Sequence, residues 1–258
     1  MLKHYFFFYK WYNVIGDGMF KTIDGNDIHY TDKNSEYKNV IVLLHGWGQN
    51  KEMMAPLANE FEDIRVICVD LPGFGSSTKN KSLISVYDYS LMLNKFLTKL
   101  NVNDPVVIGH SFGGKVALTY ASMFSVSKLI VLASPFKASR VSSFKKFLIF
   151  IKDKLNLKFL ANVYTKLFGS TDYKNANEDL KEVLKSSVST DISDEVKKIK
   201  VPTLIFWGDK DEAINIDHGY ELESLINDSA LIKLDFGDHY AYLNRKYNIP
   251  NIIKEFLR

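Results

Sequence analysis

The segment Gly109-His110-Ser111-Phe112-Gly113-Gly114 could carry nucleophilic chemistry. A serine in the pattern G-x-S-x-G, directly after a predicted strand and before a predicted helix, sits on a sharp turn that exposes its hydroxyl. The start of the helix favours the negative charge that develops there. The alternatives are a plain glycine-rich turn and a phosphate-binding loop, but neither G-x-G-x-x-G nor G-x-x-x-x-G-K-[ST] fits these residues. The pattern therefore predicts Ser111 as a nucleophile.

A serine hydroxyl needs an adjacent base at neutral pH, and the chain has six histidines. His239 follows the last predicted strand and precedes the last predicted helix, so it lies on a loop at the same sheet edge as Ser111. His45 and His110 flank the chemistry, and we expect them to hydrogen-bond locally rather than to take up protons. A structural role is the usual interpretation of a lone histidine, but the position of His239 favours it as the base.

The acid of such a triad should come between the serine and the histidine in chain order. Three carboxylates follow the predicted strand Thr203–Trp207, namely Asp209, Asp211 and Glu212. Asp211 lies further into the loop and can reach toward the histidine. Asp209 is adjacent to the turn, and we expect it to hydrogen-bond the loop backbone. Position alone leaves Asp211 only slightly ahead of its neighbours.

Acyl transfer also needs N–H donors aimed at the developing oxyanion. The usual pair is the amide after the nucleophile and one from the loop after the third strand, which are here Phe112 and Trp47. Trp47 lies in His45-Gly46-Trp47-Gly48, whose glycines let the backbone approach a ligand closely. Gly46 and His110 are expected to contact the substrate beside these donors. A plain glycine turn is the alternative for the loop.

Short β-rich runs alternate with amphipathic stretches along the chain, which is typical of a mostly parallel sheet covered by helices. The predicted strands are Met19–Ile23, Asp27–Tyr30, Val40–Leu44, Arg65–Val69, Pro105–Ile108, Lys128–Leu132, Thr203–Trp207 and Ala230–Leu234. The predicted helices are Met54–Phe61, Val86–Leu100, Lys115–Phe124, Asp217–Ile226 and Tyr247–Leu257. The inner strands are continuously apolar, as strands buried on both faces must be, so they should form the centre of the sheet.

The alternation stops between Ser134 and Ile199, where the intervening chain is far longer than an ordinary connection. We therefore predict an α/β core over 18–134 and 200–258 and a helical cap over 135–199. Residues 1–17 form an aromatic extension whose stretch Tyr5 to Tyr12 superficially resembles a signal peptide. Lys10 interrupts that stretch and no small-residue cleavage site follows, so we expect a cytoplasmic protein. A segment packed on the domain or on a partner, or a shallow membrane contact, is the alternative role of this extension.

The composition is that of an ordinary globular protein, with 46% hydrophobic and 24% charged residues in a chain of 258. No apolar run has the length of a spanning helix. The formal net charge of +3 is too small to indicate nucleic-acid binding. The single cysteine, Cys68, excludes an intramolecular disulfide and fits a reducing compartment. No ligand cluster has the spacing of a metal site, so we expect neither a metal nor an organic cofactor.

The predicted cap is rich in basic residues interleaved with phenylalanine and leucine. The basic residues are Lys137, Arg140, Lys145, Lys146, Lys152, Lys154 and Lys158. A solvated amphipathic helix is the ordinary explanation of such a pattern. The alternatives are docking of an acidic carrier protein and contact with an anionic membrane surface.

With these motifs assembled, the chain resembles the α/β-hydrolase superfamily from about Gly18 to Arg258. The resemblance is carried by His45–Gly48, Asp70–Ser77, Gly109–Gly114, Gly208–Asp211 and Gly237–His239. In that family the second aspartate of a Gly-Asp-x-Asp stretch is the triad acid, which matches Asp211. The resemblance implies an eight-stranded, mostly parallel sheet with a cap after the sixth strand. It also implies hydrolysis of a carboxylic ester, or a related acyl bond, of a small-molecule or acyl-chain substrate through Ser111, His239 and Asp211.

Within the superfamily, a serine nucleophile argues against the haloalkane dehalogenases, which have aspartate there. The lack of an acid in Ala133-Ser134-Pro135 disfavours the branch whose triad acid follows the sixth strand. The chain is similar to lid-containing esterases and carbon–carbon bond hydrolases. Its two glycine loops are similar to those of the pimeloyl carrier-protein methyl ester esterases, which often carry tryptophan in place of His110. A receptor that keeps the fold with little turnover is the alternative from another class.

Overall fold

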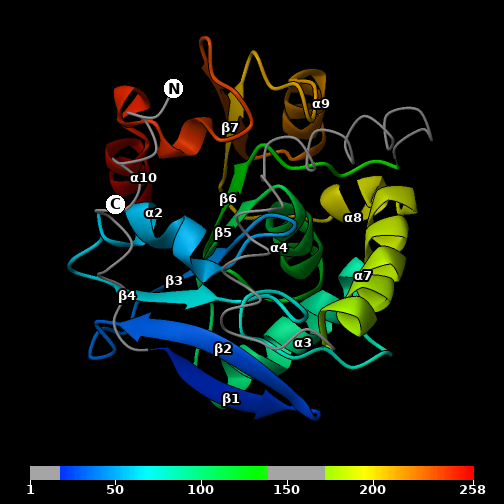
Figure 1. Ribbon diagram of the computed structural model, residues 1–258. Coiled ribbons are helices and arrows are strands. Elements are labelled where there is room, and N and C mark those ends of the chain that lie inside the picture. The colour runs from blue at the N-terminus through cyan, green and yellow to red at the C-terminus, as the bar shows by residue number, and fades with distance from the viewer. Residues whose placement is uncertain (1–17, 139–171) are drawn as a thin grey trace, which may run out of the picture.

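The computed structural model describes residues 18–138 and 172–258, whose strands form a single sheet in the order β1-β2-β4-β3-β5-β6-β7-β8 (Figure 1). The strands are β1 (Met19–Ile23), β2 (Asn26–Lys33), β3 (Val40–Leu44), β4 (Arg65–Val69), β5 (Val106–His110), β6 (Lys128–Leu132), β7 (Thr203–Gly208) and β8 (Ser229–Leu234). The pairs β1–β2 and β2–β4 are antiparallel, and the other five pairs are parallel. The predicted mostly parallel sheet of eight strands is confirmed.

The strand β2 is longer than the sequence predicts. It runs on to Lys33 because Thr31, Asp32 and Lys33 pair with β4. Because these residues are polar, the hydrophobic pattern of the sequence does not indicate this extension. The Asp32 carboxylate is used within the sheet, since it accepts hydrogen bonds from the Arg65 guanidinium at 2.6 and 2.8 Å.

Helices cover both faces of the sheet. The helices are α2 (Ala55–Ala58), α3 (Val86–Lys99), α4 (Phe112–Met123), α7 (Asp172–Ser189), α8 (Ser193–Val196), α9 (Asp217–Leu225) and α10 (Ile249–Leu257). The start of α3 is fixed by a capping box, in which Ser85 and Asp88 satisfy each other's backbone N–H groups. The helix α10 begins two residues later than predicted, because Asn248 adopts the left-handed conformation and Pro250 occupies the first turn.

Alternate residues of the central strands enter two separate cores, as the period of a strand requires. In β3, Val42 and Leu44 face the core beneath α3 and α4, whereas Ile41 and Leu43 face the core beneath α2 and α10. Figure 1 shows these two helical layers on opposite sides of the sheet. The central strands are buried on both faces, as their apolar sequences predict.

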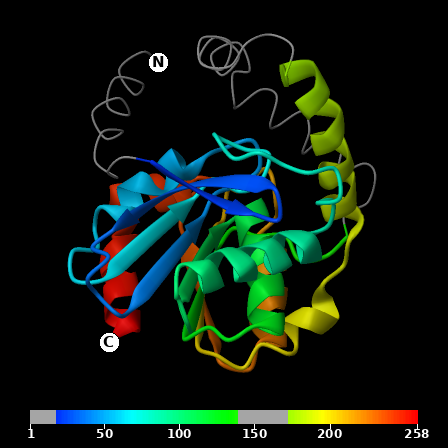
Figure 2. The ribbon, with the colours of Figure 1, turned by 90° about the horizontal axis from the view of Figure 1, so that it is seen from below.

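The chain between β6 and β7 departs from the sheet and returns beside its starting point. The backbone N–H of Ile192 donates to the carbonyl of Phe136 at 2.9 Å. The part that the structure describes includes α7, which stands at the edge of the helical layer that contains α3 and α4 (Figure 2). The predicted cap over 135–199 is therefore seen only in part, because 139–171 lie outside the described residues, as do residues 1–17 of the N-terminal extension.

The last turn of α7 is attached to α4 by a buried lysine. The Lys115 ammonium donates hydrogen bonds to the carbonyl oxygens of Ser187 at 2.7 Å and Thr190 at 2.6 Å. These carbonyls lie at the C-terminal end of a helix, where backbone acceptors lack intrahelical partners and the dipole favours a cation. Across 18–138 and 172–258, no helix combines the length and the apolar character needed to cross a bilayer.

Candidate active site

Ser111 lies on the turn between β5 and α4 with φ 51° and ψ −113°, a conformation that non-glycine residues rarely adopt. Hydrogen bonds from three directions hold it there. Its N–H donates to the Leu132 carbonyl at 3.0 Å, and its carbonyl accepts from the Lys115 N–H at 3.0 Å and from the Ser134 hydroxyl at 2.9 Å. The strained turn that the G-x-S-x-G pattern predicts is present, and its neighbours keep it in place.

The glycines on either side of Ser111 are required by close backbone contacts. A Cβ at Gly109 would lie 2.4 Å from the Gly113 carbonyl oxygen, and a Cβ at Gly113 would lie 2.4 Å from the His45 carbonyl oxygen. Any side chain at either position would displace the backbone. The same contact brings the loop after β3 against the first turn of α4.

His239 and Asp211 form a buried pair. The Nδ1 atom of His239 lies 2.7 Å from Oδ2 of Asp211, and the exposed fractions of the two side chains are 3% and 0%. The other carboxylate oxygen accepts the N–H groups of Ala213 and Ile214 at 2.8 and 2.9 Å. An ionised carboxylate only accepts hydrogen bonds, so Nδ1 carries the proton, which leaves the lone pair of the neutral imidazole on Nε2. This is the tautomer that a base for a serine hydroxyl requires.

The two neighbouring carboxylates have other roles. The Asp209 carboxylate accepts the backbone N–H of Phe236 at 2.7 Å, which confirms the expected bond to a loop backbone. Glu212 is exposed. Among the three candidates, Asp211 is the residue that the structure brings to His239.

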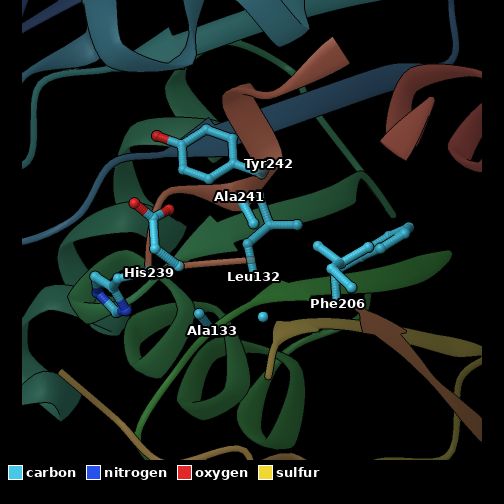
Figure 3. A pocket seen from close by; sticks show the side chains of 9 residues that line it. Leu132, Ala133, Phe206, His239, Ala241 and Tyr242 are labelled. Atoms are coloured by element: carbon cyan, nitrogen blue, oxygen red, sulfur yellow. The ribbon is translucent and has the colours of Figure 1, made fainter. Parts of the chain in front are cut away.

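The loop that carries His239 follows β8 and packs against the ends of β6 and β7. A small pocket lies where these elements meet, and Figure 3 shows His239, Ala241 and Tyr242 among the residues that line it. Leu132, the last residue of β6, and Ala133, which follows it, also line this pocket. His239 therefore lies at the carboxyl edge of the sheet, where Ser111 also lies.

The loop after β3 is held by the side chain of His45. Its Nδ1 donates to the Gly46 carbonyl at 2.8 Å, and its Nε2 accepts the Leu71 N–H at 3.0 Å. Burial lowers the pKa of His45, although the nearby Asp70 carboxylate opposes this effect. His45 is thus neutral with both nitrogens satisfied, which confirms its expected local hydrogen bonding.

The two predicted oxyanion donors come from neighbouring residues in space. The rings of Trp47 and Phe112 meet edge to face with their centroids 5.3 Å apart. Phe112 is the first residue of α4, so its N–H has no carbonyl one turn earlier in the helix. The structure brings the two donor-bearing segments together, and the hydrogen bonding of an oxyanion there stays a prediction.

Gly46 and His110, the predicted substrate contacts, are both buried. The Gly46 N–H donates to the Gln49 side chain at 2.9 Å. The His110 side chain is fully buried, and its Nε2 lies 3.0 Å from the His239 carbonyl oxygen. In this structure the His110 side chain contacts the loop that carries His239, and contact of Gly46 or His110 with a substrate stays a prediction.

Sequence reasoning missed two residues around the nucleophile, Ser134 and Lys115. Ser134 holds the Ser111 carbonyl, and Lys115 reaches α7 from the first turn of α4. Burial lowers the pKa of Lys115 to about 8, against the attraction of Asp191. Lysine is almost never fully buried unless it is paired. A lysine among the apolar residues of this helix was therefore a sequence signal of a buried ammonium group with a partner inside the protein.

Comparison with known proteins shows the same fold and hydrolytic relatives. The family model described as the alpha/beta hydrolase fold matches residues 39–149. Lipase 1 of Psychrobacter immobilis is 24% identical over 83% of this chain and 75% of its own. The 2-hydroxy-6-oxononadienedioate/2-hydroxy-6-oxononatrienedioate hydrolase 1 of Pseudomonas putida is 26% identical over 90% and 92%. The solved structure of an esterase from Exiguobacterium antarcticum superposes with a TM-score of 0.74, at 22% identity over 93% of this chain and 99% of its own.

Proposed function

Because this chain is a hydrolase of the α/β-hydrolase superfamily, we propose that it is a serine hydrolase that cleaves a carboxylic ester or a related acyl bond. The substrate is a small molecule or an acyl chain. One observation carries the proposal, namely the buried hydrogen bond between His239 Nδ1 and Asp211 on the sheet edge that bears Ser111. A lone histidine at that edge would have no fixed tautomer, whereas this one presents Nε2 as a base.

In the proposed reaction, His239 Nε2 takes the proton from the Ser111 hydroxyl as the oxygen attacks the substrate carbonyl. The N–H groups of Phe112 and Trp47 stabilise the oxyanion. Collapse of the tetrahedral intermediate breaks the ester bond, and His239 gives its proton to the leaving alcohol. Water then loses a proton to His239 and attacks the acyl-enzyme, and His239 returns this proton to the Ser111 oxygen as the acid is released. Asp211 stays ionised and holds the imidazole.

The experiment combines labelling with turnover. A fluorophosphonate should label the wild-type protein at Ser111 and leave Ser111→Ala unlabelled. The variant should also lose about 10⁴-fold or more in kcat for p-nitrophenyl butyrate. Absence of labelling, or a Ser111→Ala variant as active as the wild type, would contradict the proposal. Labelling with near-zero turnover across acyl chain lengths would favour a ligand-binding receptor.

A second candidate reaction is hydrolysis of a carbon–carbon bond. It is favoured by the likeness to the Pseudomonas putida hydrolase, whose name specifies a 2-hydroxy-6-oxo dienoate class of substrate. The two reactions are separated by offering a 2-hydroxy-6-oxo dienoate and p-nitrophenyl butyrate in parallel. A higher kcat/KM for the dienoate would identify carbon–carbon cleavage as the main activity.

We also propose a cytoplasmic location, which the buried free thiol of Cys68 supports because such thiols suit a reducing compartment. Docking of an acidic carrier protein or of an anionic membrane surface by the basic cap stays a prediction. Lys137 is a cap cation within the described residues, and it forms an ion pair with Glu221.

A further inference from the structure

His110 is a buried polar side chain that the proposed reaction does not use. It ends β5 one residue before Ser111, and its side chain is fully buried. Its Nε2 atom lies 3.0 Å from the backbone carbonyl oxygen of His239, a residue 129 positions further along the chain. A carbonyl oxygen only accepts hydrogen bonds, so Nε2 carries the proton and donates it.

The other nitrogen of the His110 ring faces the loop after β3. A Cβ at Gly46 would lie 2.8 Å from His110 Nδ1, so a glycine leaves the room that this ring needs. Nδ1 is buried without a hydrogen-bond partner in the described part of the chain. Burial and then the neighbouring imidazole of His239 lower the pKa of His110 well below its ordinary value, and His45 acts in the same direction. The ring is therefore neutral.

Aromatic packing fixes the orientation of the His110 ring. Its centroid lies 4.8 Å from that of His239, 5.4 Å from that of Tyr240 and 4.7 Å from that of Tyr242. All three partners lie in the segment after β8. His110 thus directly precedes the proposed nucleophile in the sequence and lies against Gly46 of the loop after β3. It also contacts the loop of the proposed base through a hydrogen bond and ring contacts.

We propose that His110 is a positioning residue that fixes His239 relative to Ser111 by donating its Nε2 proton to the His239 carbonyl. Asp211 restrains the His239 ring at Nδ1, whereas His110 restrains the backbone of the same residue. Two restraints at different atoms define both the tilt of the imidazole and its distance from the nucleophile. This inference rests on the proposed function, since it concerns the base of that reaction.

Two substitutions separate the donor from the ring. His110→Phe keeps a buried ring without a donor, and His110→Gln keeps an N–H donor near the position of Nε2. For p-nitrophenyl butyrate we expect kcat to fall about 100-fold in His110→Phe, because misplacement of a catalytic group by about 1 Å has an effect of this size. We expect less than a 10-fold fall in His110→Gln, with KM within about threefold in both variants.

Thr119→Val is the matched control. Thr119 is also fully buried and also donates one hydrogen bond to a backbone carbonyl, that of Lys115 at 2.9 Å. Its kcat should stay within about twofold of the wild type, because isolated loss of a buried hydrogen bond acts on stability. Wild-type kcat in His110→Phe, or equal losses in His110→Phe and His110→Gln, would overturn the positioning role.

Nitrogen-15 NMR of labelled histidine tests the same role without turnover. We expect His110 to remain neutral with the proton on Nε2 from about pH 5 to 8, the range in which an ordinary histidine changes charge. Protonation within this range, or a proton on Nδ1, would overturn the inference. The expected NMR result in a protein that fails to react with fluorophosphonates or esters would overturn the proposed function alone.

Discussion

The Asp211 carboxylate accepts the Nδ1 proton of His239 at 2.7 Å, while Asp209, two residues earlier in the same loop, accepts the N–H of Phe236 at the same distance. The two aspartates thus have different roles in neighbouring positions. One restrains a side chain that can take up a proton, and the other restrains the backbone of the loop that bears it.

Substitution of these aspartates should have unequal effects on catalysis. Asp211→Asn should lower kcat for p-nitrophenyl butyrate by roughly 10²- to 10⁴-fold, because an amide can stabilise the wrong imidazole tautomer and cannot stabilise an imidazolium. Asp209→Asn keeps an acceptor for the Phe236 N–H and should cost less than about fivefold. Steady-state kinetics of the two variants decides the matter, and an equal loss in both would argue against Asp211 as the triad acid.

Ser134→Ala should weaken the turn that holds Ser111. The variant loses the hydrogen bond to the Ser111 carbonyl and leaves a buried acceptor unpaired, which should lower the unfolding free energy by about 1–3 kcal/mol. Because this turn positions the Ser111 hydroxyl, its weakening should also lower kcat several-fold. Ser122→Ala is the control, since it removes a similar bond to the Thr119 carbonyl at the far end of α4. Thermal unfolding and ester hydrolysis of both variants would show whether only Ser134 affects the two quantities together.

The stability of the protein should depend on pH through Lys115. Burial lowers the pKa of Lys115 to about 8 from 10.5, so between these pH values the unfolded state binds more protons than the folded state. The unfolding free energy of the wild type relative to Lys115→Met should therefore be flat below pH 8 and rise between pH 8 and 10.5. The full rise is on the order of 3 kcal/mol.

Urea unfolding of the wild type and of Lys115→Met at several pH values measures this difference, in which titration of groups shared by both proteins cancels. Lys95→Met is a control, because Lys95 is exposed and pairs with Asp24 at 2.5 Å. A difference between wild type and Lys115→Met that does not change with pH would show that the ammonium has its ordinary pKa.

The Cys68 thiol should be inert in the folded protein. Burial raises its pKa to about 12, so the reactive thiolate is scarce at neutral pH. A chromogenic disulfide reagent should titrate one thiol in guanidinium chloride and almost none without it, and ester hydrolysis should survive exposure to the reagent. Fast modification of the native protein would contradict this expectation.

The sequence predicted the parts of the fold whose signal is local. Central strands such as β3 and β5 are recognisable from continuous apolar runs, and Ser111 from glycines at fixed spacing. The end of β2 was not predicted, because Asp32 and Lys33 are stabilised by pairing with β4 rather than by burial of apolar side chains.

The residues of the candidate site also divide into those that the local sequence predicts and those that depend on distant parts of the chain. Ser111 and His239 follow from their places beside strands, but the choice of Asp211 over Asp209 depends on which loop atoms lie nearby, and position alone left it open. The roles of Ser134 and Lys115 depend on partners that are distant in the chain, Ser111 and the end of α7. No periodicity in one segment carries information about such partners.

The hydrogen bond between Ile192 and Phe136 joins the points where the chain leaves and rejoins the sheet domain. An excursion whose two ends meet can change in length and composition while the strands on either side keep their register. The sheet domain and the chain between Phe136 and Ile192 can therefore change in sequence independently of each other.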